Sequence, residues 1–102
     1  MSSAITPETR TFLQFLSQAR KEQLKSLFCY ATVKQLNAVF EIILNYLAGN
    51  IQQDRKFDKR QNLFKTLTDR KFALSRKRRI LCTSTEYRQV IQTLVKSWGQ
   101  SI

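Results

Sequence analysis

Residues 32–49, TVKQLNAVFEIILNYLAG, decide the fold class of this chain. Thr32 and Gln35 have the spacing of a capping box, and behind them apolar side chains recur every three or four residues until Gly49. The recurring positions are Leu36, Val39, Phe40, Ile43, Leu44 and Leu47, with Ile42 and Tyr46 beside them. So wide an apolar face predicts a helix that is surrounded by others and lies at the centre of the core.

Two more helical segments are predicted before this stretch. Thr6 is a candidate N-cap with Pro7 at the first helical position, and the apolar residues that follow predict a helix over 7–18. The segment 20–31 carries one apolar stripe, at Leu24, Leu27, Phe28 and Ala31. It is either a second helix or a continuation of the first.

Three helical segments are predicted after it. A sparse apolar stripe predicts a helix over about 54–70, and residues 71–74 interrupt the pattern. Ser75 is a candidate cap for a short basic helix through Arg79 that ends with residues 80–82. Thr83 and Glu86 form a second capping box before a last helix, whose candidate C-cap is Gly99. The apolar stripe of this last helix consists of Tyr87, Val90, Ile91, Leu94, Val95 and Trp98.

These segments predict an all-α protein, a compact bundle of about five to six short helices. The chain has 102 residues, a length typical of one domain, and 42% of them are apolar, which is enough for a core. It contains two glycines and one proline, all near predicted helix ends, and no run of period two that would predict a strand.

The two cysteines lie in apolar surroundings on separate predicted helices. No histidine and no CxxC motif accompanies Cys29 or Cys82, so we expect neither a metal site nor a cofactor. Buried free thiols are the favoured interpretation, with a disulfide as the alternative. Residues 1–11 do not resemble a signal peptide, and no apolar run approaches the ~20 residues of a membrane span. We therefore expect a location inside a cell, such as the nucleus, or within a virion, and not secretion.

Charge is the most informative bulk property. The net charge is +11, and residues 55–79 contribute +9 of it through eleven bases and two acids. A solvated surface normally mixes both signs, whereas this segment is lopsided, which favours binding to the phosphates of DNA or RNA with little sequence specificity. The candidate nucleic-acid-binding residues are Arg55, Lys56, Lys59, Arg60, Lys65, Arg70, Lys71, Arg76, Lys77, Arg78 and Arg79.

Other residue types give weaker signals. Phe57, Phe64 and Phe72 are spaced for stacking on bases, but core packing is the favoured interpretation because Phe57 and Phe64 lie on an apolar stripe. The tyrosines have the same explanation. Trp98 is either a core residue or the anchor of an interface. Without histidine, paired carboxylates or a glycine-rich phosphate loop, we expect no enzyme and no small-molecule substrate.

Residues 45–51, NYLAGNI, and 67–81, LTDRKFALSRKRRIL, resemble blocks in small basic proteins of Polinton or Maverick elements, adintoviruses and related animal DNA viruses. The resemblance covers residues 34–81. It implies a viral or transposon product, a virion protein that condenses DNA or lines the capsid interior. The chain departs from the family after Leu81, where a glycine-rich apolar tail is replaced by Cys82, Thr83, Ser84 and the last predicted helix.

A protein-interaction module is the rival interpretation. The broad apolar stripes of the helices that precede Gly49 and Gly99 would then form a self-association interface. The bases would meet an acidic protein, a capsid wall or anionic lipid.

Overall fold

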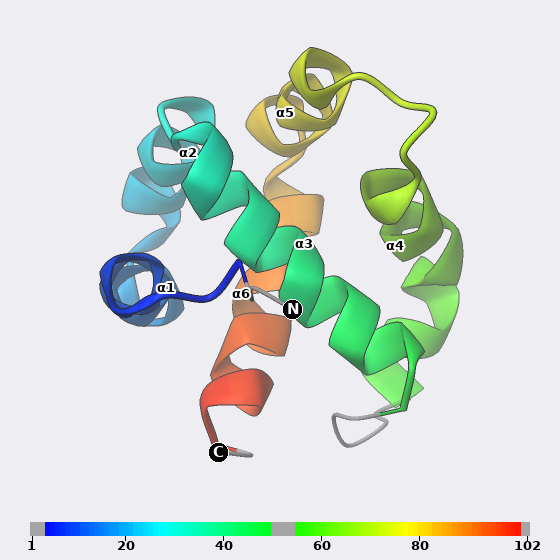
Figure 1. Cartoon of the computed structure of the whole chain (residues 1–102), viewed down its shortest axis with the longest axis horizontal. Helices are drawn as coiled ribbons and strands as arrows, with labels where there is room; N and C mark the ends of the chain where they lie inside the picture. The colour runs from blue at the N-terminus through cyan, green and yellow to red at the C-terminus, as the bar shows by residue number, and fades with distance from the viewer. Residues whose placement is uncertain (1–3, 50–54, 101–102) are drawn as a thin grey trace.

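The computed structural model describes residues 4–49 and 55–100, except for the side chains of Arg55, Lys56, Asp58 and Gln100. These residues form no strand, and the predicted all-α fold is confirmed (Figure 1). The elements are α1 (Pro7–Gln18), α2 (Lys21–Cys29), α3 (Val33–Leu47), the 3₁₀ helix η1 (Arg55–Arg60), α4 (Gln61–Thr68), α5 (Leu74–Thr83) and α6 (Thr85–Gln100).

Helix α1 begins at a reciprocal cap. The Thr6 hydroxyl accepts a hydrogen bond from the Thr9 amide, and the Thr9 hydroxyl accepts one from the Thr6 amide, at 3.3 and 2.7 Å. This cap and Pro7 fix the predicted start of α1. The extended backbone of Arg20, with φ −74° and ψ 163°, separates α2 from α1, so residues 20–31 contain a distinct helix.

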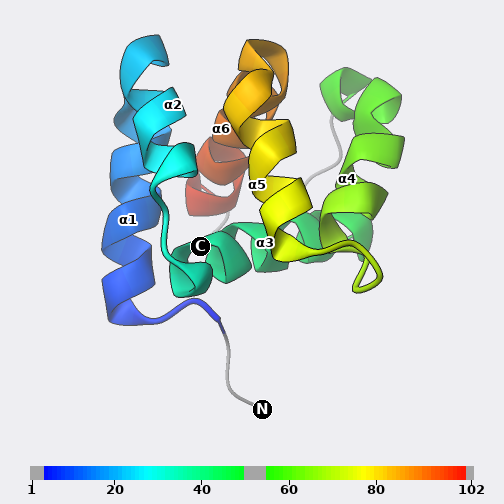
Figure 2. The same cartoon turned by 90° about the horizontal axis from the view of Figure 1, so that it is seen from above.

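Helix α3 is the central element, as predicted. Its capping box pairs the Gln35 amide with the Thr32 hydroxyl at 3.1 Å and the Thr32 amide with the Gln35 side chain at 2.8 Å. Gly49 follows its end with φ +83°, which a residue with a Cβ rarely adopts. In Figure 2, α3 lies across one end of the other helices. Its buried residues are Leu36, Ala38, Val39, Phe40, Ile42, Ile43 and Tyr46.

The segment predicted as one helix over 54–70 is divided. Residues 55–60 form η1, α4 is limited to 61–68, and residue 54 lies outside the described residues. The end of α4 is set by Asp69, whose carboxylate accepts a hydrogen bond from the Lys71 amide at 2.9 Å. An aspartate that bonds the backbone two residues ahead favours a turn over a further helical turn.

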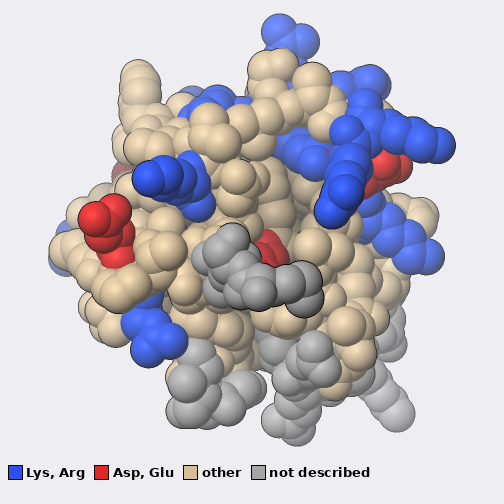
Figure 3. Space-filling view, in the orientation of Figure 1, with Lys and Arg blue, Asp and Glu red and all other residues tan. Residues whose placement is uncertain are grey.

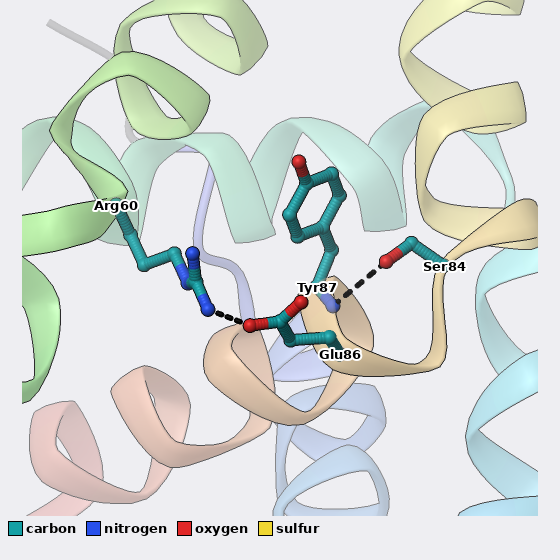
Figure 4. Close-up of polar contacts among 4 residues, drawn as sticks. All are labelled: Arg60, Ser84, Glu86 and Tyr87. Carbon is teal, nitrogen blue, oxygen red and sulfur yellow. Dashed lines mark hydrogen bonds and ion pairs between the residues drawn. The ribbon is translucent and has the colours of Figure 1, made fainter.

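Three predicted helix ends are wrong. Helix α5 begins at Leu74, before the predicted cap Ser75. Leu74 packs against the core as part of the first helical turn. The cap of α6 is Ser84, which accepts a hydrogen bond from the Tyr87 amide at 3.2 Å (Figure 4). Thr83 instead ends α5, its hydroxyl donating to the Arg79 carbonyl at 2.9 Å. Helix α6 continues through Gly99 to Gln100, so Gly99 is not its C-cap.

An aromatic group joins η1 and α4 to α3 within one contiguous core. The rings of Phe57 and Phe64 meet the edge of Tyr46 with centroids 5.1 and 5.5 Å away. All three side chains are buried, which confirms the predicted core packing of Phe57 and Phe64. Phe57 and Phe64, which are apolar residues of the basic segment, therefore attach η1 and α4 to the core.

Long polar side chains from elsewhere in the chain complete the C-termini of three helices. Gln92 donates to the carbonyls of Leu16 and Ala19 at the end of α1, at 3.0 and 2.8 Å. Arg78 donates to those of Cys29 and Ala31 after α2, at 3.1 and 2.6 Å. Arg88 donates to those of Leu81 and Cys82 in α5, both at 2.8 Å. The last carbonyls of a helix lack intrahelical donors, and these side chains supply them.

Cys29 and Cys82 form a disulfide, which corrects the expectation of free thiols. The bridge joins the ends of α2 and α5 with Cα atoms 5.4 Å apart, and it closes a sequence separation of 53 residues. The two helices also pack against each other along their length. The apolar residues around Cys29 and Cys82 in the sequence, from which their burial was predicted, belong to this helix pair.

Candidate nucleic-acid interface

Six of the eleven predicted cations are exposed. They come from the end of η1, from α4, from the connection 69–73 and from α5. In Figure 3 the basic side chains gather over α4, α5 and their connection, at the upper right. We call these six residues the basic surface: Lys59, Lys65, Arg70, Lys71, Arg76 and Arg79. The side chains of Arg55 and Lys56 lie outside the described residues.

The other three cations are engaged within the protein. Arg60 forms an ion pair with Glu86 of α6 (Figure 4). Arg78 caps the end of α2. Lys77 is 8% exposed, with its ammonium 5.2 Å from the centre of the Phe40 ring. The free positive charge of the segment is therefore smaller than its composition indicates.

Helical spacing orders the outer cations of α5. Arg76 and Arg79 are three residues apart and thus lie on one face, where they line a concave surface of about 510 Å³ together with Ser75. The Arg76 guanidinium lies 5.0 Å from the centre of the Phe72 ring, a cation–π contact that restrains it. Arg78, between them in sequence, points the other way and reaches α2.

Among the described side chains of residues 55–79, one acid accompanies the basic surface. Asp69 is half-buried, and one of its oxygens accepts the hydrogen bond from the Lys71 amide. In the part of the chain that the structure describes, Arg60–Glu86 is the one ion pair, so no cation of the basic surface is paired with a carboxylate. Unpaired exposed cations of one sign create a positive potential that attracts phosphate groups.

Trp98 belongs to the bundle, which agrees with the core alternative. Its side chain is half-buried against the core, and the Arg10 guanidinium lies 6.0 Å from the centre of its ring. This contact joins α6 to α1. As an interface residue Trp98 would offer only the part of its ring that the bundle leaves uncovered.

The two most exposed large apolar side chains of the described residues lie elsewhere, on α1 and directly after α2, while Val33 and Leu44 are exposed on α3. Phe15 is 66% exposed and Tyr30 is 85% exposed, so the prediction of a packed Tyr30 is wrong. They flank a groove of about 530 Å³ that includes Ala19, Gln23 and Leu27. The sequence did not single out this groove, because Phe15 belongs to the same apolar cluster as buried residues of α1.

Sites of other kinds are not formed by the described residues. Among residues 4–49 and 55–100 no three His, Cys, Asp or Glu side chains group closely enough to hold a metal ion. No single helix there is long and apolar enough to cross a membrane; α2 and α3 meet that criterion only as a pair bent by 114°.

Comparison of the chain with protein-family models, with curated proteins and with solved structures finds no match.

Proposed function

We propose that this protein binds the phosphate backbone of DNA or RNA, without catalysis and with little sequence specificity, through its basic surface. The observation that carries the proposal is the set of six exposed cations on adjoining elements, none of them ion-paired among the described residues. Neutralising phosphates releases condensed counterions, which supplies affinity for any sequence.

The surroundings of the aromatic residues favour backbone contacts over contacts with bases. Phe57 and Phe64 are buried, and the face of Phe72 is covered by Arg76. Stacking on unpaired bases needs an accessible ring. The cations also come from several short elements and not from one long helix face. This arrangement favours contacts with the phosphates of the nucleic-acid backbone over contacts with base edges in a groove.

We further propose that the protein acts as a DNA-condensing or core component of a virion, as its resemblance to small basic proteins of animal DNA viruses and transposons implies. The Cys29–Cys82 disulfide supports exposure of the particle to an oxidising environment, where disulfides persist. Disulfides are rare in proteins of the reducing cytosol and nucleus.

A salt series tests phosphate binding directly. Affinity for a labelled 20-base-pair duplex would be measured by fluorescence anisotropy, with protein freed of copurified nucleic acid. If all six cations contact phosphates, the logarithm of the binding constant falls with the logarithm of salt concentration with a slope of about −5.

Matched double variants locate the surface. Arg76→Gln with Arg79→Gln should reduce the slope by about 2 units, whereas Lys21→Gln with Lys25→Gln removes the same charge from exposed positions of α2 and should change it far less. Affinity that is independent of salt, or equal losses in both variants, would refute the proposal.

The exposed groove between α1 and α2 supports a second candidate function, self-association. The apolar stripes of α3 and α6, expected to form such an interface, are largely taken up by the core, although Leu44 of the α3 stripe is exposed. Phe15 and Tyr30 are the most exposed large apolar side chains among the described residues. Sedimentation of the wild type and of Phe15→Ser with Tyr30→Ser over a range of concentrations tests it. A wild type that stays monomeric throughout excludes it.

A further inference from the structure

A pocket of about 290 Å³ lies between α3, α4 and α5, beside the basic surface. We call it the α3–α5 pocket. Its polar lining includes Asn37 and Glu41 of α3, Thr68 of α4, Arg70 of the connection and Lys77 of α5. Phe40, Leu44 and Leu67 supply apolar walls. Arg70 therefore belongs both to the basic surface and to this pocket.

Lys77 is the unusual member of the lining. Lysine is rarely buried without a partner of opposite charge, because an ammonium loses its hydration there. Lys77 is 8% exposed, and within the described residues no carboxylate lies within ion-pairing distance of it. The Phe40 ring compensates for part of the lost hydration. The ammonium itself is not among the buried polar atoms that lack a hydrogen-bond partner, so it keeps contact with solvent, and the pocket is the space from which an anion reaches it.

We propose that the α3–α5 pocket receives one phosphate group of the bound nucleic acid, with Lys77 and Arg70 supplying the positive charge. This inference rests on the proposed function and names a specific subsite within it. The Asn37 side chain is exposed at the pocket and offers an amide donor. The phosphate is thus held by an ammonium on a largely buried side chain and by an exposed guanidinium, in contrast to the outer contacts of the basic surface.

The remaining lining restricts what accompanies the phosphate. The Glu41 carboxylate, which accepts a hydrogen bond from the Ala4 amide at 3.3 Å, opposes any anion in the pocket, so the two cations must outweigh it and a second negative group is disfavoured further. Leu44 is half-exposed and can cover the apolar part of a sugar or base. The volume lies at the small end of the range for ligand pockets, which suits one nucleotide unit and excludes a longer segment.

The test uses the thermal stability of the whole protein with three probes: inorganic phosphate, thymidine monophosphate and thymidine, at constant ionic strength. Ligand that binds the folded state raises its stability. We expect phosphate and thymidine monophosphate to raise the melting temperature, the nucleotide at lower concentration, and thymidine to have no effect. No stabilisation by either phosphate probe would overturn the inference.

Two variants assign the effect to the pocket. Lys77→Met keeps an unbranched side chain on Phe40 and removes the charge, so it should raise the half-maximal phosphate concentration about 10-fold or more. Lys65→Met removes an exposed cation of α4 that does not line the pocket and should leave that concentration unchanged. If Lys77→Met fails to fold, Arg70→Gln replaces it, since Arg70 is exposed.

The subsite and the proposed function fail differently. Equal phosphate stabilisation in wild type, Lys77→Met and Arg70→Gln would overturn the subsite, while salt-dependent binding of the duplex would still stand. Duplex binding that does not depend on salt would overturn the function itself.

Discussion

Replacing Arg88 with methionine should strongly destabilise the bundle. Arg88 is 5% exposed, and its guanidinium donates to the carbonyls of Leu81 and Cys82 and to the Thr85 hydroxyl, which lies 3.0 Å away. Methionine would leave two carbonyls at the end of α5 without these donors, at about 1–3 kcal/mol each. The wild-type side chain also has a cost, because its buried Nε has no acceptor in the described part of the chain. We therefore expect a net loss of about 3 kcal/mol.

Urea unfolding followed by circular dichroism measures this loss, with the disulfide intact in every sample. A loss of about 3 kcal/mol corresponds to a fall in melting temperature of about 12–24 °C for a chain of this size. Arg79→Met is the matched control, since it makes the same chemical change at an exposed position of α5, and it should stay within about 0.5 kcal/mol of the wild type. An Arg88→Met protein as stable as this control would refute the assignment of Arg88 as the donor that completes α5.

Three further predictions concern the framework of the fold. Reduction of the Cys29–Cys82 bridge should lower the free energy of unfolding by about 2–4 kcal/mol, because the bridge closes a 53-residue separation. Unfolding curves with and without a phosphine reductant measure this loss. The reductant should not change the stability of a Cys29→Ala, Cys82→Ala protein. Gly49→Ala should destabilise the protein by about 1 kcal/mol, because φ is +83° at this position. Gly99→Ala should stabilise it by about 0.5–1 kcal/mol, because Gly99 lies inside α6 with open space at its Cβ. Thermal unfolding measures both effects, and the same sign for both would contradict the conformational argument. Phe64→Ala, at a fully buried position beside Tyr46 and Phe57, should cost about 3–5 kcal/mol by urea unfolding, and a loss below 1 kcal/mol would show that the aromatic group is not tightly packed.

The parts of the fold that were predictable from sequence depend on local signals. Helix α1 has the predicted bounds and α3 the predicted start, because each begins at a reciprocal cap encoded within four residues. The start of α5 depends on tertiary packing instead, since Leu74 joins the helix by contacting the core and not through a cap. Ser84 was missed for a related reason: Thr83 has an equally good sequence pattern, but its hydroxyl bonds back into α5.

The basic segment was recognisable from composition, but the roles of its members were not. Arg76, Lys77, Arg78 and Arg79 are equivalent by residue type, yet the turn of α5 sends two of them outward, one onto Phe40 and one to the end of α2. The residues that Lys77 and Arg78 contact, in α3 and at the end of α2, lie more than 30 residues earlier in the chain. No pattern within the segment specifies those neighbours, so exposure could be read only from the folded chain.

The shortage of glycine explains part of the basic character of this chain. Helices commonly end at a glycine in the left-handed conformation, but with two glycines in the sequence only Gly49 has this role among the described residues. The ends of α1, α2 and α5 are completed by Gln92, Arg78 and Arg88, and two of these donors carry charge. Positive charge at a helix C-terminus is also favoured by the helix dipole. Arg78 and Arg88 therefore contribute to the net charge of +11 through their role in helix termination. Under the proposed function, only the exposed cations should contribute to the dependence of affinity on salt.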